Sequence, residues 1–455
     1  NNDHLHEVKT HLERARAPMI IVGGGHKGGG SMVVEVADNT GAALFTTYAG
    51  RGLVPDDHPR HFGAMLARPD SAEILRRADL LIIVGSEMSQ GDLWRDDPGF
   101  DGTVMRIDID AQSLTDSMGA EYIYKYDAGL FMAGLAHATR DCTPAVKWRP
   151  AEVAATRARW REQVQAERPG IVDVADAVRA ATPKDAMIYS DMTQFAYAAK
   201  EIWPMTHPHH WHHPTGFGTL GYALPAAIGG AVARKGQPTM AIIGDYGFHY
   251  TMAELGVAVE LNLPLPIILW DNGKLKEIED SMIAAQIQPN AVVARNPDFC
   301  KLAKAFGAHA AAPQSLNDMQ NDVRTAFDAN GPTLIYVTPT SRLLLTENTT
   351  GSGAAPQSHA TSHLGPLCVV HPAPRLGGDI GRAAGFRGVD DQEPHGFART
   401  ARAAVFAARR VRPPLALKPD GRFGHAGRCG HGHHQRSPKG HGLEQRFEHH
   451  DNSIH

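Results

Sequence analysis

The chain has 455 residues, of which 42% are hydrophobic and 21% are charged, and its formal net charge is −4. This length predicts about two or three domains, and the apolar content is sufficient for sizeable cores. A slightly acidic chain is not suited to nucleic acid as its main partner. No run approaches the roughly 20 apolar residues that a membrane-spanning helix needs. We therefore expect neither nucleic acid nor a membrane as a partner.

The four cysteines are scattered, at positions 142, 300, 368 and 429. They are too few and too far apart for a disulfide framework or a zinc site, which favours a reducing, cytoplasmic location. Residues 1–4 read Asn-Asn-Asp-His, with neither an initiator methionine nor the apolar region of a signal peptide. We therefore expect this sequence to start inside a longer protein.

Residues 1–145 are predicted to form a doubly wound α/β domain with a parallel sheet, because short apolar runs alternate with helical stretches. Glycine clusters follow the first run, at residues 23–25 and 28–30. They lack the full dinucleotide-binding fingerprint and are weak signals for such a site. The predicted strands are residues 19–22, 42–47, 80–84 and 104–109.

Residues 146–169 are predicted to link this domain to a second doubly wound domain, residues 170–347. The linker contains an amphipathic, charged stretch, 151–167. In the second domain, short apolar runs that stop at small or polar residues have the pattern of buried parallel strands. The predicted fold class is thus α/β, with two parallel-sheet domains. The elements expected around the site are strand 239–243, helix 251–261, strand 267–270 and a last strand, 332–338.

Two polar residues follow neighbouring strands of the second domain. Asp245 comes after the first strand, in the sequence Gly-Asp-Tyr-Gly, and Asn272 comes after the second. In a βαβ unit both strands end on the same edge of the sheet, so the two side chains can converge. Their oxygens are suitable ligands for a hard cation, and a helix N-terminus favours a diphosphate. The pattern predicts a magnesium-diphosphate site, although Gly-Asp-Tyr-Gly alone is also typical of a simple turn.

These residues resemble the cofactor motif of the thiamine-diphosphate enzymes of the acetolactate synthase and 2-oxoacid decarboxylase superfamily. That motif begins Gly-Asp-Gly and ends Asn-Asn. This chain has Tyr246 in place of the second glycine and Asp271 in place of the first asparagine. The resemblance implies thiamine diphosphate and Mg²⁺ as cofactors. The metal ligands that it implies are the Asp245 carboxylate, the Asn272 amide and the Lys274 backbone carbonyl.

The resemblance also places Tyr246 and Gly247 against the diphosphate. Tyr246 lacks the freedom of glycine at positive φ, and the extra carboxylate of Asp271 can alter ion affinity. Residues 188–194 are similar to the family's first diphosphate loop, in which Gln194 keeps the place of the family's glutamine. A polar strand-to-helix turn explains that segment about as well.

Residues 215–229 contain a glycine-rich loop that leads into a helix of small residues. Such a loop lets the backbone approach a ligand closely, although an ordinary loop-to-helix junction has the same composition. The segment resembles the family's pyrimidine-ring segment. By that resemblance Gly218 offers its carbonyl to the cofactor's 4′-amino group. Leu220 is then the apolar wedge that bends the cofactor and brings this amino group beside the thiazolium C2 proton.

Residues 51–59 and 106–110 resemble the central domain of the same family. Some relatives hold a non-redox FAD there and many hold no ligand; we favour the absence of FAD. The family further implies an active site between two chains, in a homodimer or homotetramer, and an activating glutamate from an N-terminal pyrimidine domain. No glutamate of this chain matches that position. The catalytic residue is therefore unassigned, and we expect this chain alone to bind cofactor weakly and to turn over little.

Residues 348–455 differ abruptly in composition from the rest of the chain. They contain 12 of the 26 histidines and many arginine, glycine, proline and alanine residues with little periodicity. Such a segment cannot bury enough apolar surface to offset its ordering entropy, so we expect disorder rather than a metal site at residues 431–434. Because arginine greatly outnumbers lysine, we also expect this tail to be an out-of-frame translation of GC-rich DNA.

Acidic residues after the metal motif suggest the substrate. Glu277, Glu279 and Asp280 suit a cationic side chain, and the segment resembles 5-guanidino-2-oxopentanoate decarboxylases of arginine catabolism more than acetolactate synthases. We therefore expect decarboxylation of that 2-oxoacid, although the acids are also typical of a solvated helix start. Five histidines before the glycine-rich loop could reach the substrate or bind metal, but a polar loop is favoured: His207, His209, His210, His212 and His213.

Two other functions stay open on the sequence alone. An acetolactate synthase large-subunit-like carboligase is the enzymatic alternative, distinguished by FAD absorbance and by acetolactate formation from pyruvate. A non-catalytic remnant of a disrupted gene is the other alternative, favoured by the unusual tail and by the lack of a glutamate domain.

Overall fold

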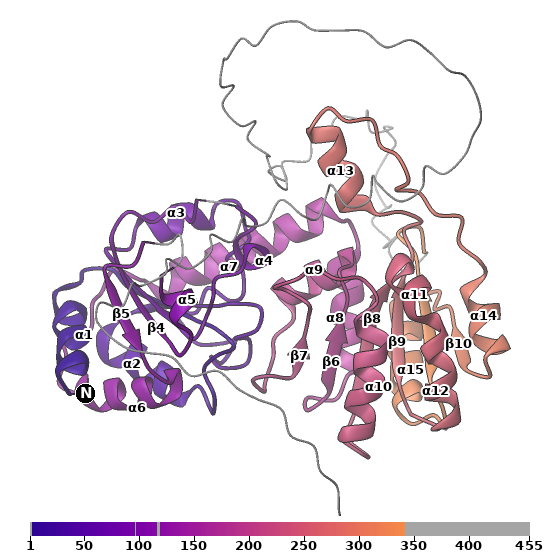
Figure 1. Cartoon of the computed structure of the whole chain (residues 1–455), viewed down its shortest axis with the longest axis horizontal. Coiled ribbons are helices and arrows are strands. Elements are labelled where there is room, and N and C mark those ends of the chain that lie inside the picture. The colour runs from indigo at the N-terminus through magenta and orange to yellow at the C-terminus, as the bar shows by residue number, and fades with distance from the viewer. Residues whose placement is uncertain (1, 96, 116–118, 342–455) are drawn as a thin grey trace, which may run out of the picture. The chain divides into compact units, whose positions relative to one another are not determined.

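The computed structural model describes residues 2–95, 97–115 and 119–341 of the chain. Within these residues Figure 1 shows two parallel β-sheets that are flanked by helices. The predicted fold class, two doubly wound α/β domains, is confirmed. The predictions for residues 348–455, including disorder and the histidines at 431–434, lie outside the described residues, as do Cys368 and Cys429.

The first sheet contains β1 (Pro18–Val22), β2 (Ala43–Thr46), β3 (Leu80–Val84), β4 (Thr103–Asp108) and β5 (Tyr122–Lys125). They lie in the order β2-β1-β3-β4-β5, and all neighbours are parallel. Successive residues of β1 alternate between two cores: Met19 and Ile21 face one, and Ile20 and Val22 face the other. Continuous apolar runs form these inner strands because both faces are covered.

The sequence predicted the first four strands to within one residue at each end. It did not predict β5, an edge strand in which Tyr124 alone is buried, so that no apolar run marks it. Around the sheet, α1 and α2 both pack against α6. The helices of this domain are α1 (Asn2–Arg14), α2 (Ser31–Thr40), α3 (Ser71–Arg76), α4 (Gln90–Leu93), α5 (Ala111–Leu114) and α6 (Ala128–Ala138).

The stretch predicted as a charged linker is largely a packed helix, α7 (Pro150–Glu167). Trp160 of α7 is fully buried and packs near Phe45 and Phe62, with ring centroids 6.1 and 6.0 Å apart respectively. The helix thus covers one face of the first sheet before the chain continues into α8 (Ile171–Ala181).

The second sheet contains β6 (Met187–Ser190), β7 (Trp211–His212), β8 (Thr239–Gly244), β9 (Pro266–Trp270), β10 (His309–Ala311) and β11 (Thr333–Val337). Their order is β10-β11-β9-β8-β6-β7, and every pair is parallel. The strands predicted from the sequence, β8, β9 and β11, form its centre. Their carboxyl ends therefore share one edge, which Figure 1 places near α11 (Asp245–Thr251) and α9 (Gln194–Ile202).

Helices cover both faces of this sheet. Met240 and Ile242 of β8 face one core, and Ala241 and Ile243 face the other. The first core is shared with α8, α9 (Gln194–Ile202) and α15 (Leu316–Phe327). The second is shared with α10 (Ala223–Ala233), α11 (Asp245–Thr251), α12 (Leu255–Glu260) and α14 (Phe299–Ala305).

The helix predicted for residues 251–261 differs from the prediction. It begins earlier, because Phe248 is fully buried and extends the apolar face back into α11. It is also interrupted: Thr251, at φ −133°, leaves helical geometry and starts a 3₁₀ turn, Met252–Glu254, before α12. A further helix, α13 (Lys276–Ala284), follows the predicted metal motif. Among the described residues, no helix is both long and apolar enough to cross a membrane.

Candidate functional site

The carboxyl ends of β8 and β9 meet at one edge of the second sheet. The two strands are paired in parallel up to Gly244 and Trp270, so Asp245 and Asp271 leave the sheet at neighbouring positions. Asp245 is the first residue of α11 and is buried, with 3% of the residue exposed. The two strand ends thus lie side by side, as the sequence predicted.

A side chain that the sequence reasoning missed joins these two aspartates. The Asn296 amide nitrogen donates to Asp245 Oδ2 at 2.8 Å and to Asp271 Oδ1 at 2.6 Å. The Tyr336 hydroxyl at the end of β11 donates to Asp271 Oδ2 at 2.8 Å, and His249 Nε2 lies 3.0 Å from Asn296 Oδ1. The edge therefore contains a hydrogen-bonded network around two carboxylates.

The electrostatics of this network favour a bound cation. Burial raises the pKa of Asp245; the Asn296 hydrogen bond opposes that effect, and the nearby Asp271 adds to it. Burial and the hydrogen bond to Asp271 raise the pKa of Tyr336, which keeps its hydroxyl a donor. Among the described residues, no lysine or arginine forms an ion pair with Asp245 or Asp271. Two neighbouring carboxylates without a cationic partner concentrate negative charge at this edge, which favours a hard divalent ion there.

Asn272 and Gln194, both predicted from the sequence, are brought together. Asn272 Nδ2 donates to Gln194 Oε1 at 3.0 Å, and Asn272 Oδ1 accepts from the Lys274 backbone N–H at 3.2 Å. Gly273, which lies between Asn272 and Lys274, has φ +68°, and this conformation permits the tight turn. Among the described residues no hydrogen bond connects Asn272 to Asp245, so the structure places them at the same edge without joining them.

Gly247 and Asp191 pack closely at the start of α11. A Cβ atom at Gly247 would lie 2.0 Å from Asp191 Oδ2, so no other residue fits there without a shift. The Asp191 carboxylate accepts backbone N–H groups of Gly221 at 2.8 Å and Tyr222 at 3.1 Å. Burial nevertheless raises its pKa to about 6. The predicted diphosphate residue Gly247 thus also has a packing role that the sequence did not indicate.

The other predicted cofactor residues are accessible or partly so. Tyr246 is half-buried inside α11 and is not among the residues with positive φ, so tyrosine's limited backbone freedom is no obstacle at this step. Gly218 has φ +66° and is exposed, and its N–H donates to the Pro214 carbonyl at 2.7 Å. Leu220 is half-buried beyond it.

Each of the three acidic residues proposed for substrate recognition is paired with a base of this chain. Glu277 Oε1 lies 3.0 Å from Arg168 Nη2, and both side chains are 15% exposed. Glu279 pairs with Lys274 at 2.9 Å, and Asp280 pairs with Lys276. Glu277 Oε1 also accepts from Gln194 Nε2 at 3.5 Å. Glu277 is connected to the Asn272 side chain through Gln194, and Glu279 is connected to it through Lys274.

The histidines before the glycine-rich loop do not gather around a common point. His213 is half-buried, with Nδ1 2.8 Å from Ser190 Oγ, and burial holds its pKa well below its usual value. His207 is exposed and contacts the Lys184 carbonyl. Among the described residues, the one group of three His, Cys, Asp or Glu side chains whose ligand atoms all lie within 4.8 Å of one another is instead Glu13, Asp141 and Cys142, on the surface of the first domain.

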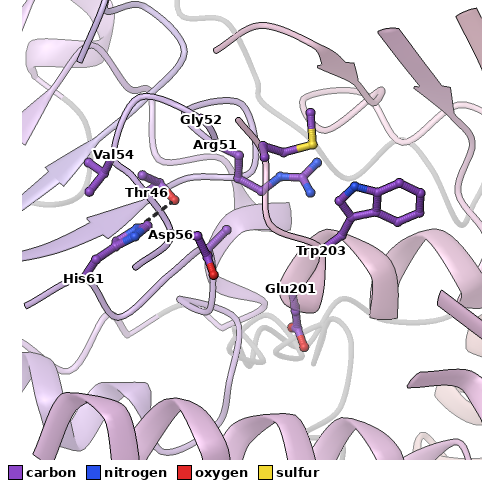
Figure 2. A pocket seen from close by; sticks show the side chains of 10 residues that line it. Thr46, Arg51, Gly52, Val54, Asp56, His61, Glu201 and Trp203 are labelled. Atoms are coloured by element: carbon purple, nitrogen blue, oxygen red, sulfur yellow. Dashed lines mark hydrogen bonds between the residues drawn. The ribbon is translucent and has the colours of Figure 1, made fainter. Parts of the chain in front are cut away.

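Figure 2 shows a cavity away from this edge, beside the loop that follows β2. Its lining includes Arg51, His61 and Glu201 but none of the site residues predicted from the sequence. The Arg51 guanidinium stacks on Trp211 at 4.2 Å, and its two terminal nitrogens have no hydrogen-bond partner among the described residues. Burial lowers the pKa of Arg51 to about 9. This region therefore contains costly buried positive charge.

Lys200 on α9 makes a testable contribution to stability in the same region. Burial, aided by Arg51 and opposed by Asp92 and Glu201, lowers its pKa from 10.5 to about 7. Between these values the unfolded chain holds a proton that the folded chain lacks, so the free energy of unfolding should rise with pH across this window. Each tenfold change in proton affinity corresponds to roughly 1.4 kcal/mol.

Lys200→Met should therefore raise the free energy of unfolding at pH 7 and flatten its increase toward pH 10. Urea unfolding at the two pH values measures both effects. The contacts of the Lys200 ammonium with the rings of Tyr48 and Tyr197, at 3.9 and 5.4 Å, oppose the expected gain. A variant that is less stable at pH 7 with an unchanged pH slope would show that these contacts outweigh burial.

Packing explains Gly25 and Gly30 in the loop after β1. A Cβ atom at Gly30 would lie 1.5 Å from the Leu53 carbonyl oxygen, and one at Gly25 would lie 2.8 Å from the Gly85 oxygen. These close backbone approaches require glycine at both positions, whether or not a dinucleotide binds there.

Comparison with known protein families assigns both domains. Residues 5–135 match the model described as thiamine pyrophosphate enzyme, central domain. Residues 191–337 match the model described as thiamine pyrophosphate enzyme, C-terminal TPP binding domain. The second match contains the carboxyl edge with Asp245, Asn272 and Asn296.

Individual relatives were found as well. The chain is 37% identical over 340 residues to the probable 2-ketoarginine decarboxylase AruI of Pseudomonas aeruginosa, covering 73% of this chain and 59% of that protein. It is 25% identical over 355 residues to the acetolactate synthase isozyme 1 large subunit of Escherichia coli, covering 74% of this chain and 61% of the relative. The chain thus spans about three fifths of the length of these curated relatives.

Proposed function

The chain belongs to the thiamine pyrophosphate enzyme family, and on that premise we propose that the protein catalyses Mg²⁺-dependent decarboxylation of a 2-oxoacid with thiamine diphosphate, the same compound as thiamine pyrophosphate. The proposed substrate is 5-guanidino-2-oxopentanoate, which is 2-ketoarginine. The observation that carries the proposal is the neighbouring pair of carboxylates at the carboxyl edge beside α11, in which Asp245 is buried and Asp271 is half-buried. The activity is proposed for the assembly with a pyrimidine domain in place, on this chain or another.

The residues at this edge fit the cofactor's charged end. Asp245, Asn272 and the Lys274 carbonyl would hold Mg²⁺, because carboxylate, amide and carbonyl oxygens are the ligands this ion prefers. The Gln194 side chain, Tyr246 and Gly247 would lie against the diphosphate, where the N-terminus of α11 favours negative charge. In bound form, thiamine diphosphate would supply the nucleophilic carbon and the electron sink for loss of carbon dioxide.

The glycine-rich loop fits the other end of the cofactor. Gly218 is exposed, and no hydrogen bond of the described residues ends on its carbonyl oxygen, which leaves it free to hold an amino group. Leu220 offers half-buried apolar surface against which a bent cofactor can rest. The activating glutamate is proposed to come from the pyrimidine domain, in a homodimer or homotetramer whose active site lies between chains.

Leu220→Ala tests the proposed support for the bent cofactor. The variant should leave Mg²⁺ binding nearly unchanged, because the Leu220 side chain has no oxygen or nitrogen ligand atom, and it should slow exchange of the C2 proton. Nuclear magnetic resonance of deuterium exchange in the full-length protein gives this rate. An exchange rate equal to that of the parent would remove Leu220 from the mechanism.

The preference for a guanidinium substrate rests on Glu277 and on the relatives. Glu277 is largely buried, accepts from one guanidinium already, that of Arg168, and is joined to Asn272 through Gln194. A substrate guanidinium could replace Arg168 at this carboxylate. The greater identity to the 2-ketoarginine decarboxylase, 37% against 25% for the acetolactate synthase, supports the same choice.

One assay separates the candidate functions. The full-length protein with Mg²⁺ and thiamine diphosphate should release carbon dioxide from 5-guanidino-2-oxopentanoate without forming acetolactate from pyruvate. Acetolactate formation together with FAD absorbance would establish the carboligase alternative, which the acetolactate synthase relatives keep open. Cofactor binding without turnover of either substrate would favour a non-catalytic remnant.

A further inference from the structure

Asn296 is fixed at both ends of its side-chain amide. Its nitrogen carries two hydrogens, and the two carboxylates that accept them are Asp245 Oδ2 at 2.8 Å and Asp271 Oδ1 at 2.6 Å. Its oxygen lies 3.0 Å from His249 Nε2 on α11. An amide with partners on both sides has a single favourable orientation, so Asn296 can act as a rigid connector between the two strand ends.

The two carboxylates that Asn296 connects are held very differently. Asp271 Oδ1 accepts from Asn296 and from the Gly273 N–H at 3.0 Å, and Asp271 Oδ2 accepts from the Tyr336 hydroxyl at 2.8 Å. Both of its oxygens are occupied, which makes it an anchor. Among the described residues, the one side-chain donor that reaches Asp245 is Asn296, and it occupies Oδ2 alone. No side-chain hydrogen bond of the described residues ends on Asp245 Oδ1, although the carboxylate also faces the Tyr246 backbone N–H and the Asp271 carboxylate.

We propose that Asn296 is a positioning residue that ties Asp245 to the fixed carboxylate of Asp271 and so presents Asp245 Oδ1 to a divalent cation. The proposal rests on the metal role proposed for Asp245. A ligand side chain that is held by a hydrogen bond is already oriented when the ion arrives. Partners of metal ligands typically contribute about 10–100-fold to metal affinity. Asn296→Ala would leave Asp245 free to rotate away from Asp271, because the two carboxylates repel each other.

The test measures Mn²⁺ affinity of the full-length protein in the presence of thiamine diphosphate, by electron paramagnetic resonance of the unbound ion. Asn296→Ala should weaken Mn²⁺ binding by about 10–100-fold, while the thermal unfolding midpoint without metal stays close to that of the parent. Asn330→Ala is the matched control, because it removes a similar contact, His309 Nε2 to Asn330 Oδ1 at 2.9 Å, elsewhere in the domain. The control should bind Mn²⁺ like the parent.

Two further variants make the outcome decisive. Tyr336→Phe removes the hydrogen bond from the Tyr336 hydroxyl to Asp271 and leaves Asn296 unchanged. It should therefore weaken Mn²⁺ binding several-fold, and it tests the proposal even if Asn296→Ala fails to fold. Normal Mn²⁺ affinity in both Asn296→Ala and Tyr336→Phe, with loss in Asp245→Ala, would overturn the positioning role and leave the proposed function intact. Normal affinity in Asp245→Ala as well would overturn the proposed metal site and the positioning role together.

Discussion

Replacing Asp245 with alanine is expected to weaken Mg²⁺-dependent binding of thiamine diphosphate by at least about tenfold. Asp245 supplies the only charged ligand atom of the proposed set, and no side-chain hydrogen bond of the described residues ends on its Oδ1. Mg²⁺ depends on a carboxylate oxygen to bridge the protein and the diphosphate. The remaining ligands, Asn272 and the Lys274 carbonyl, are neutral and cannot replace that charge.

Isothermal calorimetry measures this effect, with thiamine diphosphate titrated into the protein at saturating Mg²⁺ and with a pyrimidine domain present. Asp298→Ala is a suitable control, because Asp298 caps the start of α14 through its bond to the Lys301 N–H and is exposed. It should bind the cofactor like the parent. Unchanged affinity in Asp245→Ala would reject Asp245 as a ligand.

Glu277→Gln is expected to reduce kcat/KM for 5-guanidino-2-oxopentanoate more than tenfold relative to pyruvate. The substitution keeps the shape of the side chain and removes the charge that would pair with a guanidinium. Loss of one partner from a largely buried pair costs roughly 2–5 kcal/mol. Pyruvate has no cationic group, so its turnover should change little.

Glu279→Gln and Asp280→Asn are internal controls for that experiment. Their carboxylates pair with Lys274 and Lys276 and have no described hydrogen bond to Gln194. We expect small and equal effects of these two substitutions on both substrates. Equal losses on both substrates in Glu277→Gln would indicate damage to the cofactor site or the fold. No loss in any of the three would leave the acids as a solvated helix start and favour the acetolactate synthase alternative.

The central strands could be predicted because burial on both faces gives them an unmistakable pattern. In β3 every residue is buried, and the apolar run of the sequence coincides with the strand. The edge strand β5 has one buried residue, Tyr124, and leaves no such pattern. The interruption at Thr251 depends on how α11 and α12 pack on the sheet, which apolar spacing alone does not reveal.

The position of Asp245 at a strand end also followed from the sequence, because parallel strands with a crossover helix end on one edge. The partners of that carboxylate did not follow. Asn296 lies in a later loop, and Tyr336 belongs to the last strand, so that only the folded chain brings them to Asp271. The two residues of the Arg168–Glu277 pair are also far apart in the sequence. Contacts of this kind arise from tertiary structure, and local patterns contain no signal for them.

A crystal structure of the full-length protein with Mn²⁺ and thiamine diphosphate tests the metal and cofactor site most directly, because anomalous scattering locates the ion independently of the protein density. We predict one strong anomalous peak at the carboxyl edge of the second sheet, within ligand distance of Asp245 and Asn272 and adjacent to the diphosphate. Thiamine diphosphate bound with no metal at Asp245, or with the anomalous peak at another site, would contradict the proposed function.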